Sequence, residues 1–317
     1  MRALTYEKHG DPREGVVRKV FDARPGPGQV VVRVLAAALN PADWKIVGGK
    51  FPFLAFPKRP FVPGCEAAGI VESLDARVSG LREGDEVVFS TGLGGAFAEK
   101  VAVSALQAVR KPAALSFEEA ATLPAAGMSA LQSLRDLGGL RDGQRLLVNG
   151  AGGGIGVHAV QIGKLLGAHV TAVASAGKHE LLTGLGVDAL VDYRKADFTK
   201  AGEAWDVVLD AVPNRSFGAC ARVLAPDGVY VTTLPGAGPF LASVGAALRA
   251  PFGFRKRCRA LMLRPRPEDL GWLLDRAAAG TLKAVVGKTV PLDQAAWALS
   301  DLSAGHATGK TVVRVAP

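Results

Sequence analysis

The spacing of hydrophobic positions changes along the chain. Up to about residue 118, short apolar runs alternate with turns rich in Gly and Pro, which is typical of the strands of a small barrel or sandwich. The predicted strands are Arg2–Tyr6, Val30–Ala37, Ala67–Ser73, Glu86–Phe89 and Phe97–Val103. Asn40-Pro41-Ala42-Asp43-Trp44 interrupts these runs, and its Asn and Pro predict a turn.

Beyond Leu115, helical and strand-like periods alternate. Ser116 and Glu119 have the spacing of a capping box, so a helix is expected to begin there. The pattern then predicts helices at Ser129–Leu137 and Phe217–Leu224 and strands at Ala189–Tyr193, Val207–Val212 and Gly228–Leu234. Such alternation predicts an α/β fold with a parallel sheet covered by helices on both faces.

The last third of the chain begins with an ambiguous stretch. Residues 237–258 are apolar and then basic, which fits either a helix that covers a cleft or a short patch on a membrane surface. Pro267–Ala279 has the pattern of a helix with Pro in its first turn and Gly280 at its end. Thr289–Pro291 and Lys310–Val315 are expected to close the chain as strands.

Residues 145–178 contain the most informative pattern. An apolar run, Leu146–Val148, is followed by Ala151-Gly152-Gly153-Gly154-Ile155-Gly156, a helical pattern to Leu166 and a second apolar run at Val170–Ala174. The six residues fit G-x-G-x-x-G with alanine in the first slot. Small residues there allow a tight turn and close approach to a pyrophosphate, which the helix N-terminus attracts. The stretch therefore predicts a dinucleotide-binding unit.

The end of the second run of this unit bears on the choice of cofactor. An NAD site usually has an acidic residue there to accept from the ribose 2′-hydroxyl. The chain instead has Ser175 and Lys178, and no carboxylate lies between them. A hydroxyl and an ammonium suit a 2′-phosphate, so NADP(H) is predicted. The alternative is that Lys178 is an ordinary surface lysine.

Charge and cysteine content exclude some classes of function. The net charge is +9, but basic residues do not alternate with aromatic ones as in a nucleic-acid groove, so no nucleic-acid partner is expected. The three cysteines are far apart, which fits neither a disulfide framework nor a zinc cluster. With no apolar signal segment at the N-terminus, we expect a cytoplasmic protein without stable membrane association.

Short motifs spread over nearly the whole chain carry a family resemblance. They are Asn40–Lys45, Pro63-Gly64, Ala68–Val71, Gly84–Val87, Ala121–Pro124, Gly127–Ala130, the glycine stretch and His306–Val313. With these motifs the chain resembles the zinc-free quinone oxidoreductase branch of the medium-chain dehydrogenase/reductase superfamily, the zeta-crystallin-like branch. The resemblance implies a GroES-like catalytic domain from residues 1–118 and 266–317, a Rossmann domain at 119–265, NADPH as cofactor and a homodimer.

The same resemblance assigns residues to the cofactor. It implies that Asn40 and Ser129 lie near the nicotinamide and that Lys310 lies on a C-terminal segment that approaches the cofactor. It further implies a pyrophosphate cradle formed by Ala151, Gly152, Gly153, Gly154 and Ile155. It also implies a 2′-phosphate site formed by Ser175, Lys178 and Tyr193.

No metal site is expected. Zinc-dependent relatives place a Cys where Asn40-Pro41 stands and a His-Glu pair where Cys65-Glu66 stands. No histidine lies near Cys65 in the sequence, because His9 is the only one before His158. The sequence therefore does not offer the three Cys, His or carboxylate ligands that a catalytic zinc ion usually has.

Without a metal, hydride transfer is expected to an acceptor that is already electrophilic, such as a quinone or an α,β-unsaturated carbonyl. The oxyanion that forms needs hydrogen-bond donors, for which Asn40, Lys45 and Ser129 are candidates. Asp43 either orients a donor, relays a proton or merely caps a turn. The aromatic residues either line the acceptor pocket or pack the barrel; they are Trp44, Phe51, Phe53 and Phe56.

Two alternatives remain open. One is an enoyl thioester reductase, in which the basic residues between Arg255 and Arg266 hold a CoA-type group. The other is a redox sensor that binds NADPH but has little activity, because a fold and a cofactor site can outlive the chemistry. The three tyrosines, Tyr6, Tyr193 and Tyr230, offer no obvious proton donor to the acceptor, so solvent protonation is expected.

Overall fold

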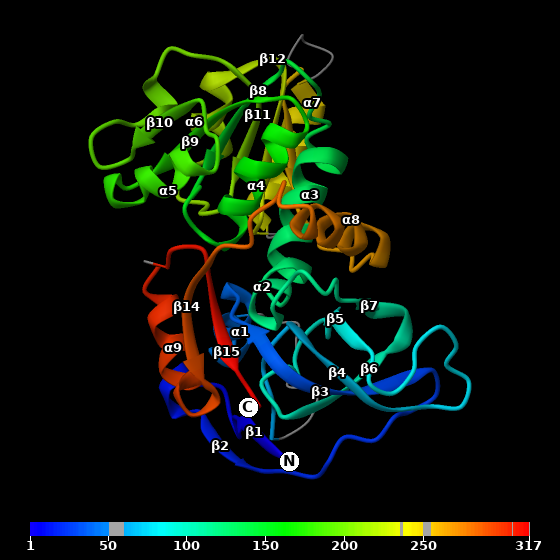
Figure 1. Ribbon diagram of the computed structural model, residues 1–317. Coiled ribbons are helices and arrows are strands. Elements are labelled where there is room, and N and C mark those ends of the chain that lie inside the picture. The colour runs from blue at the N-terminus through cyan, green and yellow to red at the C-terminus, as the bar shows by residue number, and fades with distance from the viewer. Residues whose placement is uncertain (51–59, 235–236, 250–254, 306, 317) are drawn as a thin grey trace. The chain divides into compact units, whose positions relative to one another are not determined.

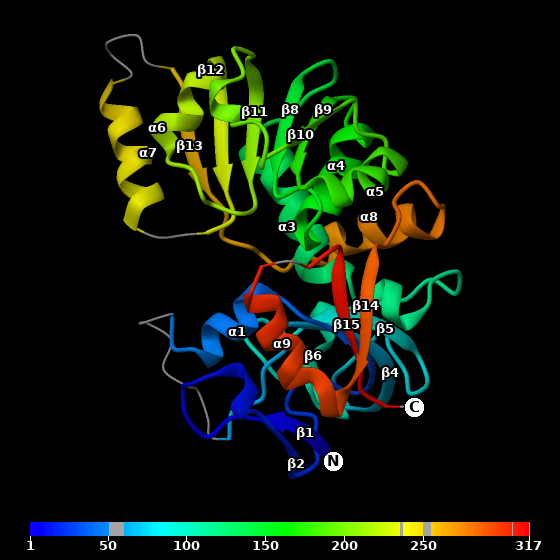
Figure 2. The same cartoon turned by 90° about the vertical axis from the view of Figure 1, so that its left-hand side faces the viewer.

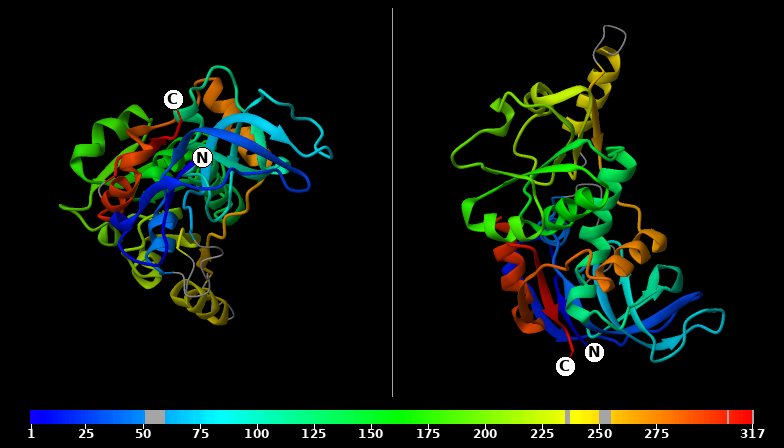
Figure 3. Two further views of the ribbon diagram at one scale, coloured as in Figure 1. Left: turned by 90° about the horizontal axis from the view of Figure 1, so that it is seen from below. Right: turned by 45° about the horizontal axis from the view of Figure 1, so that its top comes forward.

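The chain folds as two units, and the first contains both chain ends (Figures 1 and 3). The computed structural model describes residues 1–50, 60–234, 237–249, 255–305 and 307–316. Unit 1 consists of Met1–Ala126 and Pro265–Pro317, and unit 2 of Gly127–Arg264. The first junction thus lies after Ala126 rather than after residue 118. Helix α2 (Phe117–Ala120) packs against strands of unit 1, which keeps this segment in the first unit.

Unit 1 is built on a seven-stranded sheet, with a separate two-stranded pair, β1 and β2. Its central strand β3 pairs antiparallel with β4, β6 and the C-terminal strand β15. The sheet order is β14-β15-β3-β4-β5-β7, with β6 also on β3. The strands are β1 (Arg2–Thr5), β2 (Val16–Lys19), β3 (Gln29–Ala38), β4 (Glu66–Leu74), β5 (Glu86–Ser90), β6 (Lys100–Ser104), β7 (Ala108–Arg110), β14 (Val286–Pro291) and β15 (Lys310–Arg314).

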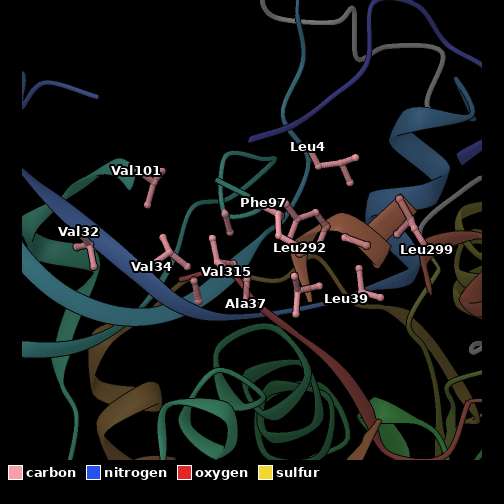
Figure 4. Close-up of a cluster of buried hydrophobic side chains, with 14 of the residues drawn as sticks. Leu4, Val32, Val34, Ala37, Leu39, Phe97, Val101, Leu292, Leu299 and Val315 are labelled. Atoms are coloured by element: carbon pink, nitrogen blue, oxygen red, sulfur yellow. The ribbon is translucent and has the colours of Figure 1, made fainter. Parts of the chain in front are cut away.

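The core of unit 1 combines residues from distant parts of the chain. Figure 4 shows Leu4, Val34 and Phe97 gathered with Leu299 and Val315, which come from near the C-terminus. All are buried, so burial of apolar surface ties the C-terminal segment to the N-terminal strands. The helices of this unit are α1 (Pro41–Val47), α2, α8 (Pro267–Ala278) and α9 (Ala295–Ser303).

Unit 2 is a six-stranded, wholly parallel sheet in the order β10-β9-β8-β11-β12-β13. Its strands are β8 (Arg145–Asn149), β9 (His169–Ala174), β10 (Ala189–Asp192), β11 (Trp205–Asp210), β12 (Leu224–Thr232) and β13 (Arg257–Ala260). The order reverses between β8 and β11, which is where open α/β sheets bind ligands. The predicted doubly wound sheet and GroES-like domain are confirmed.

Helices cover both faces of this sheet (Figure 2). On one face, α6 and α7 pack over Leu147, Val208 and Tyr230. On the other, α4 lies so close to the sheet that a Cβ at Gly163 would stand 2.6 Å from the Leu146 side chain. The helices are α3 (Met128–Leu131), α4 (Gly154–Leu165), α5 (His179–Gly184), α6 (Phe217–Cys220) and α7 (Ala237–Arg249).

The expectation of a simple turn after the first long strand was wrong. Asn40–Trp44 is not an isolated turn: Asn40 is the N-cap of α1, Pro41 its first residue and Asp43 the third residue of a capping box. Asn, Pro and Asp favour helix starts as well as turns, and the buried Ile46 and Val47 continue the helix into the core. The helix predicted at Ser129–Leu137 is confirmed: it consists of α3 and a π-helical turn at Gln132–Leu137, and a further π-helical turn at Leu123–Gly127 precedes it.

Other elements were predicted correctly or missed. Ser116 and Glu119 form the predicted capping box, and α8 begins at Pro267 as predicted. The ambiguous stretch 237–258 contains α7 and the start of β13, with residues 250–254 outside the described part. The pattern missed β2, β7, β13, α5 and α9. No helix within the described ranges combines the length and apolar character needed to span a bilayer.

Candidate functional site

In the glycine turn of unit 2, the backbone of α4 packs closely against the backbone that follows β8. β8 ends at Asn149, Gly150 adopts a φ of +80°, and α4 starts at Gly154 with Gly153 as N-cap. A Cβ at Gly156 would lie 2.5 Å from the Ala151 carbonyl oxygen and closer still to that of Gly150. Only glycine therefore lets the first turn of α4 lie against the strand end. The backbone N–H groups of this first turn have no partner within the helix, so this end of α4 fits a pyrophosphate.

Lys178 lies beside this turn. β9 ends at Ala174, and Ser175 caps a short 3-10 helix at Ala176–Lys178. A Cβ at Gly152 would stand 3.2 Å from the Lys178 Cβ and 3.3 Å from its Cγ, so the lysine stem passes over the glycine turn. Burial lowers the pKa of Lys178. The structure thus brings together the predicted pyrophosphate cradle and the predicted 2′-phosphate lysine.

Tyr193 lies at the neighbouring strand end. Asp192 of β10 pairs with Ala174 of β9, so Tyr193 and Ser175 follow adjacent strands at the same edge. The Tyr193 ring is 47% exposed, and the Arg194 guanidinium carbon lies 5.9 Å from its centroid. Arg194 was not among the predicted residues. The basic pair Arg194-Lys195, which directly follows a predicted strand, could have indicated it.

A buried polar network lies at the carboxyl ends of β8 and β11, and no sequence motif predicted it. The Asn149 amide donates to Asp210 Oδ1 over 2.9 Å, and the Tyr230 hydroxyl donates to Asp210 Oδ2 over 2.8 Å. Burial raises the pKa of Asp210. Asn149 also donates to the Val212 carbonyl, and Val212 packs against Gly150. The network therefore links the loop after β11 to the glycine turn, and it places Tyr230 in the interior.

In unit 1, Asp43 is a fully buried acceptor at the start of α1. Its Oδ2 accepts from the Asn40 backbone N–H at 2.7 Å. Its Oδ1 accepts from the Gly64 N–H at 3.2 Å and from the Cys65 thiol at 3.0 Å. Burial raises the pKa of Asp43 to about 6, although the hydrogen bond from Cys65 opposes the rise. Asp43 thus ties α1 to the start of β4.

The side chains of Asn40 and Lys310 are hydrogen-bonded to each other and to Glu66. Lys310 Nζ lies 2.7 Å from Asn40 Oδ1 and 2.7 Å from Glu66 Oε1, and it donates to the Leu39 carbonyl at 2.8 Å. Asn40 Nδ2 donates to Glu66 Oε1 at 2.8 Å and to the Ala38 carbonyl at 3.2 Å. Three donors of the ammonium meet three acceptors, and the Asn40 amide is likewise satisfied.

Lys45 differs from these two residues. It lies on α1, half-buried, with Nζ 5.6 Å from the centroid of the Trp44 ring. Burial, followed by the nearby Lys50, lowers the pKa of Lys45. Its ammonium has no hydrogen-bonding partner among the residues that the structure describes. Ser129 is buried in α3 of unit 2. The predicted aromatic residues Phe51, Phe53 and Phe56 lie outside the described residues.

The residues that raised a metal question are engaged in other contacts. The Cys65 thiol donates to Asp43, and Glu66 pairs with Lys310. Burial raises the pKa of the Cys65 thiol well above its usual value, which disfavours the thiolate that binds metal. In the described part of the chain, no three His, Cys, Asp or Glu side chains are grouped to hold a metal ion.

The basic residues between Arg255 and Arg266 are partly occupied by structural contacts. Arg255 lies 3.1 Å from Asp227, and Lys256 Nζ donates to the Ala221 carbonyl at 2.6 Å. On β13, Arg257 and Arg259 are exposed. The structure thus leaves only part of this cluster open to an anionic ligand.

Comparison with known proteins gives the family. Residues 26–113 match the alcohol dehydrogenase GroES-like domain and residues 185–313 match the zinc-binding dehydrogenase family. The chloroplast envelope quinone oxidoreductase homolog of Arabidopsis thaliana is 34% identical, over 99% of this chain and 98% of that protein. The 2-methylene-furan-3-one reductase of Solanum lycopersicum is 36% identical, over 91% of this chain and 72% of that protein.

A solved structure agrees with these relatives. The quinone oxidoreductase of Coxiella burnetii superposes with a TM-score of 0.88 at 27% identity, over 100% of this chain and 99% of that one. The glycine turn at the switch point of a parallel sheet agrees with a nicotinamide cofactor. The chain is an oxidoreductase that uses a nicotinamide cofactor, and it belongs to the quinone oxidoreductase branch of the medium-chain dehydrogenase/reductase superfamily.

Proposed function

We propose that this protein transfers a hydride from NADPH to a quinone or an α,β-unsaturated carbonyl without the help of a metal ion. The observation that carries the proposal is the buried cluster of Asn40, Glu66 and Lys310. It places an ammonium among side chains whose positions correspond to metal ligands in zinc-dependent relatives. An acceptor that is electrophilic by itself does not need a Lewis acid, since the charge delocalises onto its oxygen.

The preference for NADPH rests on the edge formed by β9 and β10. Ser175 and Tyr193 follow these two strands at the same edge, and Arg194 lies beside the tyrosine. The stem of Lys178 lies beside the glycine turn. The segment Ala174–Lys178 contains no carboxylate to accept from a ribose 2′-hydroxyl or to repel a 2′-phosphate. Bound there, the cofactor supplies the hydride. The role of the chain is to position it through the glycine turn and helix start, from Ala151 to Ile155, and through the cations Lys178 and Arg194.

Lys45 is proposed as the group that stabilises the developing oxyanion. Addition of hydride leaves a negative charge on the acceptor oxygen, which a preorganised donor stabilises. The lowered pKa of Lys45 also brings its ammonium closer to proton transfer at neutral pH. Ser129 is proposed as a second donor near the nicotinamide. Asn40 and Lys310, whose polar atoms are already satisfied, are assigned to the support of this machinery rather than to contact with the acceptor.

The names of the relatives agree with this class of acceptor. The Arabidopsis relative is named for quinones, and the tomato relative for a ring ketone that carries a conjugated methylene group. A quinone can take hydride at carbon or at one of its oxygens, whereas a conjugated methylene ketone takes it at the methylene carbon; in each case the negative charge ends on an oxygen. By the same resemblance we propose a homodimer, and we retain the cytoplasm as the predicted location because all three cysteines are free.

The test is consumption of NADPH and of NADH by the purified protein after treatment with a chelator. The acceptors are quinones, free enones and enoyl thioesters, and the products are identified. Turnover of quinones or enones at unchanged rate after chelation, with NADPH bound more tightly than NADH, agrees with the proposal. Loss of activity that zinc restores would overturn its metal-free part. A preference for NADH would overturn the assignment of the 2′-phosphate site.

Turnover of thioesters alone would instead establish the enoyl thioester reductase. The exposed Arg257 and Arg259 are the observation that keeps this second candidate. Tight NADPH binding with no turnover of any acceptor would favour the redox sensor, which shares the cofactor cradle but not the chemistry.

A further inference from the structure

Lys310 is an unusual lysine because it is 3% exposed and fully satisfied. Its ammonium donates to three oxygens, which come from the segment between β3 and α1 and from the start of β4: the Leu39 carbonyl, Asn40 Oδ1 and Glu66 Oε1, at 2.7–2.8 Å. A buried ammonium without such partners would lose its hydration without compensation. The three acceptors therefore form a binding site for one cation. The chain fills this site itself with the ammonium of Lys310, on β15.

The network extends from this ammonium to two other structural elements. Glu66, which is fully buried, accepts from the Ala125 backbone N–H at 2.5 Å, in the π-helical turn that precedes unit 2. Asn40 donates its backbone N–H to Asp43, which also holds Gly64. The charge on Lys310 thus balances Glu66, and Glu66 and Asn40 orient the end of β3, the first turn of α1 and the turn at Ala125.

We infer that Lys310 is a positioning residue for hydride transfer, which acts through Asn40 and Glu66 on the first turn of α1 and thereby places Lys45. This inference rests on the function proposed above. With the ammonium absent, Glu66 keeps a buried charge without a counter-ion and Asn40 Oδ1 loses its donor. The start of α1 then keeps its contacts through Asp43 but loses this anchor, and we expect its orientation to change. A displacement of about 1 Å in a group that stabilises the reaction lowers its rate by about 100-fold.

The chain offers a matched control in the same unit. Lys111 is also a lysine whose side chain is 3% exposed; its Nζ lies 3.0 Å from Glu86 and donates to the carbonyls of Pro112 and Leu115. Its contacts are with Glu86 and with the segment before α2, and none is with a residue of α1. Lys111→Met therefore removes a comparable buried ammonium without touching the turn at Asn40.

The experiment compares Lys310→Met, Lys111→Met and the double variant Lys310→Met/Glu66→Gln. Methionine keeps the length of lysine without its charge, and the double variant removes both charges, which often restores stability. For Lys310→Met we expect kcat per folded molecule to fall about 100-fold, while the Kd for NADPH changes less than about twofold because the cradle lies in unit 2. The double variant should recover thermal stability but not kcat. Lys111→Met should lose stability with kcat within about threefold of wild type.

Two results would overturn the inference: a kcat that recovers together with stability in the double variant, or an equal loss of kcat in Lys111→Met. Amide hydrogen exchange separates this inference from the proposed function. Faster exchange at Asn40 and Asp43 in Lys310→Met, but not in Lys111→Met, supports the network even if wild-type protein reduces none of the acceptors. Unchanged exchange at both amides refutes it regardless of activity.

Discussion

Gly156 offers the sharpest test of the glycine turn. A Cβ at this position would stand 2.5 Å from the Ala151 carbonyl oxygen and nearer still to that of Gly150, whereas real Cβ contacts stay above about 3.0 Å. Both obstacles are backbone, so α4 must move away from β8. Overpacking of this kind costs about 1–3 kcal/mol, and two rigid groups place the cost near the upper end. Alanine has a higher helix propensity than glycine, which offsets about 1 kcal/mol of this cost. The expected net loss is about 2 kcal/mol.

Thermal unfolding followed by circular dichroism measures this loss. About 2 kcal/mol lowers the Tm of a unit of this size by about 4–8 °C. Gly153→Ala is the control, because its φ of −91° suits alanine and the nearest atom to the new Cβ, the Gly150 carbonyl oxygen, is 3.5 Å away. Its Tm should stay close to that of wild type. If Gly156→Ala unfolds at the wild-type temperature, or Gly153→Ala loses as much, the close approach of α4 is refuted.

Four further outcomes are expected. Lys178→Ala should weaken NADPH binding about tenfold and NADH binding hardly at all, because one charge-assisted contact to the 2′-phosphate is lost; equal losses in fluorescence titrations would contradict the assignment. Lys45→Met should lower kcat about 100-fold at unchanged NADPH affinity, and steady-state rates near those of wild type would remove it from the mechanism. Asp43 has a folded pKa of about 6, raised from 3.8, so its contribution to stability is complete below pH 3.8 and falls by about 3 kcal/mol as pH rises through 6; urea unfolding of Asp43→Asn should lack this slope. Tyr230→Phe should destabilise the protein by about 1–3 kcal/mol in urea, since Asp210 loses a buried donor, and a neutral effect would argue against the network.

Local patterns predicted the secondary structure around the glycine turn well. The strand, glycine turn and helix of residues 145–166 are contiguous, so spacing alone predicted their order in space. Parallel register then explains why Ser175 and Tyr193, at the ends of two separate strands, share one edge. Arg194 was missed because a basic residue after a strand has no distinctive spacing.

The first turn of α1 shows where local patterns fail. Asn, Pro and Asp are common both in isolated turns and at helix starts, and residues 40–44 carry too little periodicity to separate the two. The burial of Ile46 and Val47 in the core of unit 1 decides for the helix. This information lies in partners distant along the chain, which the local pattern does not contain.

The order of strand, glycine turn and helix, the α/β class and the lack of an acidic residue after β9 could all be predicted from local patterns, because each depends on neighbours in the chain. The contacts among Asn40, Glu66 and Lys310 could not, because they depend on strand pairing. These residues lie at the ends of β3, β4 and β15, and antiparallel pairing of β3 with the other two strands brings them within 2.8 Å of one another. Burial then requires a partner for each polar atom, and this requirement joins the three side chains in one charge-balanced cluster.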